Sequence, residues 1–353
     1  WNSFPYLFSL LSSSCRSMVR WWKSVCVNVL LRVVQVVGKV GTGMVGWLVS
    51  AVMTRRYVEE RALFAQRVKN VQQKSPDHVK MTVLNLPAFE LAKKIRQKTY
   101  TSQQVVDIFI SEIVEVNGII NAVVVPQFEV AREEAKHADK IIEEAQHLDT
   151  LPPLLGVPIS VKESFSVKGL PFTSGLIKRK NVVAADDADV IKNLRKSGAI
   201  VIGLTNMSEL CMWYESSNPI YGRTKNPYNP MRIAGGSSGG EGSILGSGAS
   251  VIGVGADVGG SIRLPSFFNG IFGHKPTALL VSNTGQYPNA EGEAVRMLST
   301  GPMARYSTDL WPMLTIMAEN SFSCLSPHHY TFGKKHNFEH NKRHPSQCLP
   351  PSV

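Results

Sequence analysis

A serine and a lysine in this sequence have the types and the surroundings of a nucleophile and its base. Ser261 lies in the glycine-rich stretch GGSSGGEGSILGSGASVIGVGADVGGSIRLPS (235–266), and Lys162 lies at the end of the apolar run VPISVK. Glycines beside a serine let successive backbone N–H groups converge on one point, which suits a developing oxyanion. The nucleophile needs a base, and a lysine in a dry, apolar setting can be neutral and act as one. Composition alone leaves open the alternative of a surface lysine that ends a strand.

Other functions of glycine-rich sequences fit this stretch poorly. A phosphate-binding P-loop requires GxxxxGK[ST], which is missing, and in a dinucleotide-binding GxGxxG the third glycine position falls on Val258. Flexible linkers lack buried apolar residues, whereas residues 250–257 read as a buried strand. A Ser-His-Asp triad is disfavoured, because the sequence around Ser261 is GGSIR and not a GxSxG elbow, and His274 is the only histidine between residues 148 and 327. A serine site with a lysine base is therefore the favoured interpretation.

Three segments of the sequence resemble the amidase signature family. The run GGSSGGEG followed by GADVGGSIRLPS is a long and specific pattern of that family. GVPISVKES (156–164) is similar to its lysine segment, and TNMSELCMWYESSNPIYGRTKNPYN (205–229) is similar to its intervening segment. The spacings of 75 residues from Lys162 to Ser237 and 24 from Ser237 to Ser261 also fit. The resemblance runs over roughly two thirds of the chain, and within the family it is strongest to the fatty-acid amide hydrolases.

The resemblance implies a role for each of these residues. Lys162 would be the general base, Ser237 the bridging serine that relays a proton, and Ser261 the nucleophile that becomes acylated. The family has a cis peptide bond before the bridging serine, here between Gly236 and Ser237. The backbone N–H groups expected to form the oxyanion hole are those of Val258, Gly259, Gly260 and Ser261. The residues expected to support this geometry are Gly236, Ser238, Asp257 and Arg263.

The activity that the resemblance implies is hydrolysis of fatty-acid amides to a free acid and an amine or ammonia, through an acyl-enzyme. No cofactor and no metal ion is expected to take part, and a homodimer is suggested by the resemblance alone. HNFEH (336–340) fits an inverted zinc-protease pattern, but it lies in a polar stretch just before Pro345, so no zinc site is predicted. The residues that suggest an apolar substrate pocket are Cys211, Met212, Trp213, Phe267 and Phe268.

Helices and buried strands alternate along residues 85–318, which is the pattern of an α/β domain. Thr101–Gln104 has the form of a capping box, and the helix behind it has an apolar face that includes Val105, Phe109 and Ile113. We therefore expect an amidase-signature fold, a mixed central β-sheet covered by helices. The other expected elements are helices at 128–147, 188–197 and 242–249 and buried strands at 154–164, 199–206 and 250–257.

The net charge of +11 is concentrated at the two ends of the chain. Residues 1–58 hold seven basic and no acidic residues, and residues 320–353 hold four basic and one acidic, which leaves +1 for the middle (11 − 7 − 3). No single domain carries a dense basic face, so nucleic-acid binding is not expected. The five cysteines form no CxxC pair, which favours a reduced, intracellular compartment.

The apolar residues 25–53 predict a membrane anchor inside a basic N-terminal segment, residues 1–60. The uncharged part, 40–53, has 14 residues, whereas a full span needs about 20. The anchor would therefore either span the bilayer with Arg32 and Lys39 near its ends or lie in one leaflet. The alternatives are a targeting segment and a soluble helix. An anchor would place the protein on an intracellular membrane or a lipid droplet.

Residues 319–353 predict a disordered tail that is unrelated to the preceding domain, since they hold five of the nine histidines and four prolines without helix or strand periodicity. The family resemblance ends near Met317, whereas family members continue further, so we expect the amidase domain to be incomplete. Two hypotheses of different classes follow. The chain is either a membrane-associated serine amidase or an inactive, truncated product of the same kind of gene.

Overall fold

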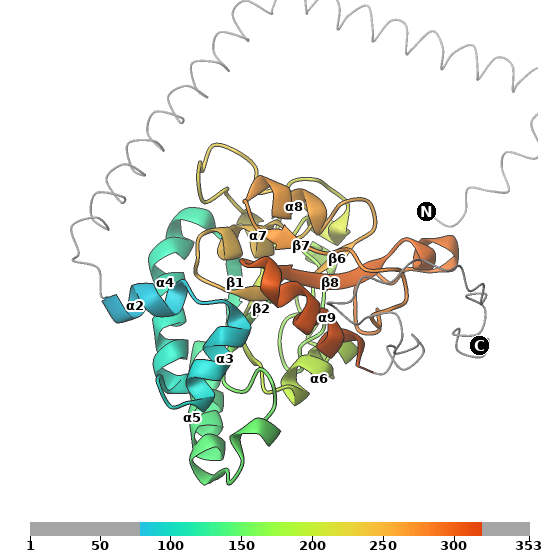
Figure 1. Ribbon diagram of the computed structural model, residues 1–353. Helices are drawn as coiled ribbons and strands as arrows, with labels where there is room; N and C mark the ends of the chain where they lie inside the picture. The colour runs from blue at the N-terminus through green and yellow to red at the C-terminus, as the bar shows by residue number, and fades with distance from the viewer. Residues whose placement is uncertain (1–77, 320–353) are drawn as a thin grey trace, which may run out of the picture. The chain divides into compact units, whose positions relative to one another are not determined.

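The structure is a computed structural model that describes residues 78–319. In Figure 1 these residues form a β-sheet with helices packed around it. The α-helices are α2 (His78–Leu84), α3 (Ala88–Arg96), α4 (Ser102–Ile120), α5 (Phe128–Glu144), α6 (Asp189–Lys196), α7 (Gly239–Gly246), α8 (Arg263–Phe268) and α9 (Leu310–Ala318). The short 3₁₀ helices are η1 (Leu148–Thr150), η2 (Ile177–Arg179), η3 (Glu209–Cys211), η4 (Gly292–Arg296) and η5 (Ser307–Asp309).

The main sheet has six strands in the order β1-β3-β2-β6-β8-β7. β2 runs parallel to β3 and to β6, whereas the pairs β1–β3, β6–β8 and β7–β8 are antiparallel. The sheet is therefore mixed and covered by helices, as the sequence predicted. Its strands are β1 (Val123–Pro126), β2 (Pro158–Lys162), β3 (Ile200–Thr205), β6 (Ile252–Asp257), β7 (Phe272–Gly273) and β8 (Ser299–Ala304). A separate two-stranded sheet pairs β4 (Ser217–Asn218) with β5 (Gly222–Arg223).

The strand β2 lies inside the sheet, between its two parallel neighbours β3 and β6. The chain leaves β2 through α6 to reach β3 on one side, and it leaves β3 through α7 to reach β6 on the other. Right-handed crossovers that run in opposite directions put their helices on opposite faces of the sheet. In agreement, α7 packs against β2, β6 and α4, whereas α6 packs against α9. Both faces of β2 are thus covered.

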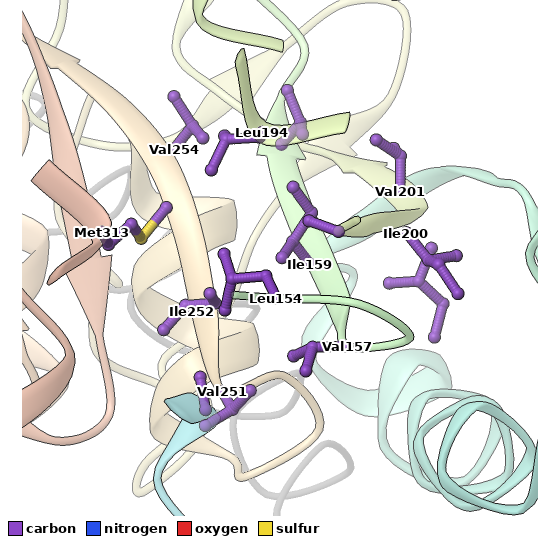
Figure 2. Packing of buried hydrophobic residues seen from close by; sticks show 14 of the residues in the cluster. Leu154, Val157, Ile159, Leu194, Ile200, Val201, Val251, Ile252, Val254 and Met313 are labelled. Atoms are coloured by element: carbon purple, nitrogen blue, oxygen red, sulfur yellow. The ribbon is translucent and has the colours of Figure 1, made fainter. Parts of the chain in front are cut away.

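The core lies between the parallel strands and these helices (Figure 2). Every residue of β2, β3, β6 and β8 is buried. Strands covered on both faces are apolar almost throughout, and this explains why these segments do not alternate apolar with polar residues. In Figure 2, Ile159 of β2 lies in the middle of the view, with Leu194 of α6 above it, Ile252 of β6 and Met313 of α9 to its left, and Ile200 of β3 to its right.

The start of α4 confirms the predicted capping box. Thr101 is the N-cap residue, and its hydroxyl oxygen accepts a hydrogen bond from the Gln104 N–H at 3.0 Å. Val105, Phe109 and Ile113 follow at helical spacing and are all buried. The cap therefore fixes where the helix begins, and the apolar face fixes how it packs.

The remaining predicted elements are present with shifted ends. The strands expected at 154–164, 199–206 and 250–257 are β2, β3 and β6. The helices expected at 188–197 and 242–249 are α6 and α7, and α7 begins three residues earlier than predicted. The helix α5 buries the alanines Ala131, Ala135 and Ala138, which lie at helical spacing.

Three predicted segments lie outside the described residues. They are the N-terminal segment 1–60 with its anchor at 25–53, the tail after residue 319, and the HNFEH pattern at 336–340. Within residues 78–319, no helix is both long and apolar enough to span a membrane.

Candidate active site

Lys162 lies at the carboxyl end of β2, on the face of the sheet that α7 covers. Its side chain is completely buried, and its Nζ donates a hydrogen bond to Ser237 Oγ at 2.6 Å. Strand residues two apart point to the same face, so Ser160 lies on the same side of β2 as Lys162. The structure therefore brings two of the three predicted catalytic side chains into direct contact in the interior.

Ser237 is held by the segment 205–229, which the sequence pattern had also singled out. The Gly236–Ser237 peptide bond is cis, as the family resemblance implied. A Cβ atom at position 236 would lie 2.5 Å from the Trp213 carbonyl oxygen, so a residue with a side chain does not fit there. The carbonyl of Ser237 accepts hydrogen bonds from Ser216 Oγ at 3.0 Å and from the Ser208 N–H at 3.3 Å.

The backbone of Ser261 lies next to Ser238, the residue that follows Ser237. Its carbonyl accepts a hydrogen bond from the Ser238 N–H at 3.2 Å, and its side chain is partly exposed. Within residues 78–319, the Oγ of Ser261 has no hydrogen-bond partner, so the Ser237-to-Ser261 side-chain contact that a proton relay requires is not formed in this structure. Such catalytic contacts are often long without substrate and tighten when it binds.

The turn that carries Ser261 is built around the Asp257 carboxylate. This side chain is completely buried and accepts hydrogen bonds from the N–H groups of Gly260 at 2.7 Å and Ile262 at 3.0 Å. Arg263 binds both carboxylate oxygens, through Nε at 3.0 Å and Nη2 at 2.9 Å. Burial alone would raise the pKa of Asp257, but the hydrogen bonds from Arg263 and the backbone outweigh it and hold the pKa below its usual value.

The predicted oxyanion hole is changed by this carboxylate. The N–H of Gly260 points to Asp257 and is occupied by that hydrogen bond. In the described part of the chain, the N–H groups of Val258, Gly259 and Ser261 bind no other residue. These three remain available to an oxyanion, whereas Gly260 acts here as part of the support for the turn. Gly260 also has a φ of +127°, a conformation that residues with side chains rarely adopt.

Of the residues predicted to form an apolar pocket, Trp213 and Phe268 lie next to the glycines that precede Ser237. Met212 and Trp213 are 76% and 59% exposed, and Cys211 is half-buried. Trp213 stacks on Tyr214, with ring centroids 4.6 Å apart. Phe268 is close to the first of these glycines, since a Cβ at Gly235 would be 3.1 Å from its ring. Phe268 and the backbone of Trp213 thus both contact the glycines that precede Ser237.

Sequence reasoning missed two residues that hold this region together. Ser216 binds the carbonyl of Ser237 and accepts a hydrogen bond from the Gly239 N–H at 2.8 Å, so it ties together both sides of Ser238. Glu241, in the first turn of α7, is completely buried close to Lys162. A carboxylate in an otherwise small and apolar helix is a signal that could have identified Glu241 in advance. Ser216 gives no such signal, because a single serine in a polar loop is unremarkable.

Comparison with known proteins decides the family. The family model described as amidase matches residues 104–345 of this chain, more than half of its length. The chain belongs to the amidase family. The resemblance read from the three sequence segments is thereby confirmed.

The relatives of this chain include proteins named fatty-acid amide hydrolases. Fatty-acid amide hydrolase 2-A of Danio rerio is 54% identical over 248 residues, which cover 69% of this chain and 47% of the relative. Fatty-acid amide hydrolase 2 of Homo sapiens is 51% identical over 249 residues, with the same coverage. Among solved structures, a fatty acid amide hydrolase has a TM-score of 0.66 at 28% identity, over 79% of this chain and 48% of that one. The chain thus spans about half the length of the curated relatives it matches.

Proposed function

We propose that this amidase hydrolyses fatty-acid amides with Ser261 as nucleophile, Ser237 as bridging serine and Lys162 as base. The observation that carries the proposal is the 2.6 Å hydrogen bond from Lys162 Nζ to Ser237 Oγ in a fully buried position. Burying a lysine costs free energy unless its amine has a hydrogen-bond partner, and here the partner is the hydroxyl of Ser237, whose neighbour Ser238 binds the Ser261 carbonyl. Membership of the amidase family supports the reaction class.

Acylation would begin with the neutral amine of Lys162. The amine takes a proton from Ser237 while Ser237 takes one from Ser261, and Ser261 Oγ forms a bond to the amide carbonyl carbon. The carbonyl oxygen becomes an oxyanion, for which the free N–H groups of Val258, Gly259 and Ser261 are suitable donors. The proton then returns from Lys162 through Ser237 to the amide nitrogen as the C–N bond breaks. The products are an acyl ester on Ser261 and a neutral amine or ammonia.

Deacylation would use the same relay. A water molecule gives one proton through Ser237 to Lys162 while its oxygen forms a bond to the ester carbonyl carbon. The ester bond then breaks, the proton returns along the same path to Ser261 Oγ, and the fatty acid leaves. One buried base thus serves both halves of the reaction, and no proton is gained or lost by the enzyme over the cycle.

The apolar surface near Ser237 supports a lipid substrate. Met212, Trp213 and Phe267 are 76%, 59% and 82% exposed, and large apolar side chains at the surface gain free energy when an acyl chain covers them. The relatives are named fatty-acid amide hydrolases, which is in line with an acyl chain bound along these side chains. The predicted anchor at 25–53 supports association with an intracellular membrane, where such substrates dissolve.

The proposal is tested by treating the purified full-length chain with a fluorophosphonate probe and locating the modified residue by peptide mass spectrometry. We expect the label on Ser261. Ser261→Ala should abolish labelling, and Lys162→Ala should slow it by about a hundredfold or more, because general base catalysis contributes about 10²–10⁴. Ser111, which is exposed on α4, provides the matched control, and Ser111→Ala should be labelled like the wild type.

The same preparations are then given an amide of a long-chain fatty acid and an amide of acetic acid. We expect a higher kcat/KM for the long-chain amide, since an acyl chain gains about 0.8 kcal/mol for each buried methylene. A wild-type chain that takes no label, or a label that persists in Ser261→Ala, would refute the catalytic assignment. Equal kcat/KM values would refute the lipid preference alone.

A further inference from the structure

Glu241 places a carboxyl group in the interior, beside the proposed base. It lies in the first turn of α7, is completely buried, and faces the sheet. Its Oε2 accepts a hydrogen bond from Ser160 Oγ at 2.7 Å, and its Oε1 accepts one from Thr205 Oγ1 at 2.8 Å. Ser160 is on the same face of β2 as Lys162, and Thr205 is the register partner of Lys162 on β3. The carboxyl group and the lysine therefore share one side of the sheet.

The sheet is shaped to accept this carboxyl group. Gly253 of β6 is paired with Ser160 of β2, and a Cβ atom at position 253 would collide with Glu241 Oε2. Burying a carboxyl group in the core costs free energy, so a protein keeps one where its hydrogen bonds are satisfied and its charge is used. Burial raises the pKa of Glu241 to about 7, against the lowering effects of its hydrogen bonds from Ser160 and Thr205 and of the Lys162 charge.

The hydrogen-bond network around Glu241 suits both the ionised and the neutral carboxyl group. Ser160 Oγ lies 3.0 Å from Ser250 Oγ, and either hydroxyl is able to donate. With Glu241 ionised, Ser250 donates to Ser160, which donates to the carboxylate. With Glu241 protonated, the carboxyl group donates to Ser160, and Ser160 donates to Ser250. Ser250 then donates to the Ile252 carbonyl at 3.3 Å. Neither state leaves a buried polar group without a partner, so the carboxyl group is able to change its charge without rearranging the fold.

We propose that Glu241 is a positioning residue that acts through Lys162, because its carboxylate supplies the counter-charge for the ammonium formed when Lys162 accepts the proton of Ser261 through Ser237. The inference rests on the proposed function. Opposite charges attract strongly where water is excluded, so an ionised carboxyl group makes the nearby amine a stronger base. The proton itself stays on Lys162 Nζ until it returns to the leaving nitrogen, and Glu241 gains none.

The neighbours of the carboxyl group make Lys162 the target of this effect. From β2, β3 and β6, the groups that meet Glu241 are Ser160, Thr205 and Gly253, and Ser250 in the turn before β6 binds Ser160. None of these groups titrates. Lys162 is the charged group that acts on it. A role limited to packing would not need a charge, because a glutamine of the same shape fills the same volume.

Glu163 offers a matched control. It directly follows Lys162 and is also completely buried, and burial likewise raises the pKa of its carboxyl group. Its Oε1 instead accepts hydrogen bonds from the Thr173 N–H at 2.6 Å and the Tyr221 hydroxyl at 3.4 Å. Glu163 lies in the turn that follows β2, and its partners Thr173 and Tyr221 are not those of Glu241. Glu163→Gln removes a buried carboxyl group without removing the one that faces the lysine side of the sheet.

The first arm of the test measures amide turnover against pH in full-length wild type, Glu241→Gln and Glu163→Gln. We expect Glu241→Gln to lower kcat on the plateau by about tenfold to a hundredfold with little change in KM, since general base catalysis contributes about 10²–10⁴ in total. The acidic limb of the pH profile of turnover should move to lower pH in this variant, because the Lys162 amine loses its proton more readily without the carboxylate. Glu163→Gln should keep the wild-type limb. If the wild type is active and Glu241→Gln has the same kcat and the same acidic limb of the pH profile, this inference would be overturned and the proposed function would stand.

The second arm does not depend on activity. It measures the free energy of unfolding from pH 4.5 to pH 9 in wild type, Lys162→Met, Glu241→Gln and the double variant. The pKa of Glu241 is raised on folding, so the folded state binds more protons and stability falls as pH rises towards about 7. Glu241→Gln should reduce this fall and leave the part that the raised pKa of Glu163 contributes. Lys162→Met should extend the fall to higher pH, because the charge that lowers the carboxyl pKa is gone. If the free energy of unfolding fell over the same pH range in wild type and in Lys162→Met, the inference would be overturned whatever the activity.

Discussion

The turn from Asp257 to Arg263 depends on one buried carboxylate, which makes Asp257→Asn the most direct substitution to test it. The neutral amide cannot accept from Gly260, Ile262 and Arg263 at once, so the free energy of unfolding should fall by about 2–3 kcal/mol at pH 7. The pKa of Asp257 is lowered on folding, so its stabilisation is complete above about pH 4 and is lost as pH falls through the folded pKa. Denaturant unfolding between pH 2.5 and pH 8 should therefore show the two proteins converging at the acid end.

An exposed aspartate provides the control for this measurement. Asp186 also has a lowered pKa, caused chiefly by its hydrogen bond from Lys192, but both side chains are largely exposed to solvent. Asp186→Asn should leave stability unchanged at every pH, because an exposed pair is screened. If Asp257→Asn were as stable as Asp186→Asn at pH 7, the carboxylate would not hold the turn.

At the residue scale, sequence reasoning succeeded where a residue's role is tied to a fixed pattern. The cis bond after Gly236 was implied by the family resemblance, and the contact between Lys162 and Ser237 agrees with the roles that the same resemblance implied. It did not predict that the Gly260 N–H binds Asp257, because the direction of one peptide group depends on the turn that surrounds it. It also passed over Glu241, since burial of a carboxyl group is decided by which strands and helix meet there.

At the scale of elements, the close approach of α7 to the sheet requires small residues on β6, and Gly253→Ala tests this. The new methyl group would displace the Glu241 carboxyl group and break its hydrogen bond from Ser160. We expect the free energy of unfolding to fall by about 1–3 kcal/mol, as for other overpacked cores. Thermal unfolding followed by circular dichroism gives the measurement, and Gly259→Ala is the control, since a Cβ at position 259 has open space around it. Equal destabilisation by the two substitutions would contradict the described packing of Glu241.

The bounds of elements were predictable where local chemistry sets them. The Thr101 cap defined the start of α4, and unbroken apolar runs defined β2 and β3. The start of α7 was missed because glycine has low helix propensity, and the helix is fixed there by contacts made at a distance, such as Gly240 against Asn206. The two-residue strands β4, β5 and β7 have no local pattern at all, since each exists only through its partner.

At the scale of the whole molecule, the chain combines an almost neutral middle with basic ends. The middle, 59–319, carries a net charge of +1 and includes the described part of the amidase domain. Residues 1–58 carry seven basic side chains, which lie within and around the apolar stretch 25–53. A basic, apolar segment is attracted both to the acyl region of a bilayer and to anionic headgroups. The proposed substrate dissolves in the same phase. Membrane binding would thus bring the site and its lipid amide together on one surface.

Membrane binding through this segment is tested by flotation of the full-length chain with vesicles of phosphatidylcholine and phosphatidylserine. We expect the wild type to float, and we expect the double variant Val45→Asp, Leu48→Asp to remain in the dense fraction, because each buried charge costs about 2.5–3.5 kcal/mol in an apolar segment. The matched control places the same two charges on the exposed valines of α4 and α5, Val114→Asp and Val130→Asp, and should float like the wild type. Equal flotation of the two double variants would exclude residues 25–53 as the site of attachment, and a wild type that does not float would exclude membrane binding by this chain.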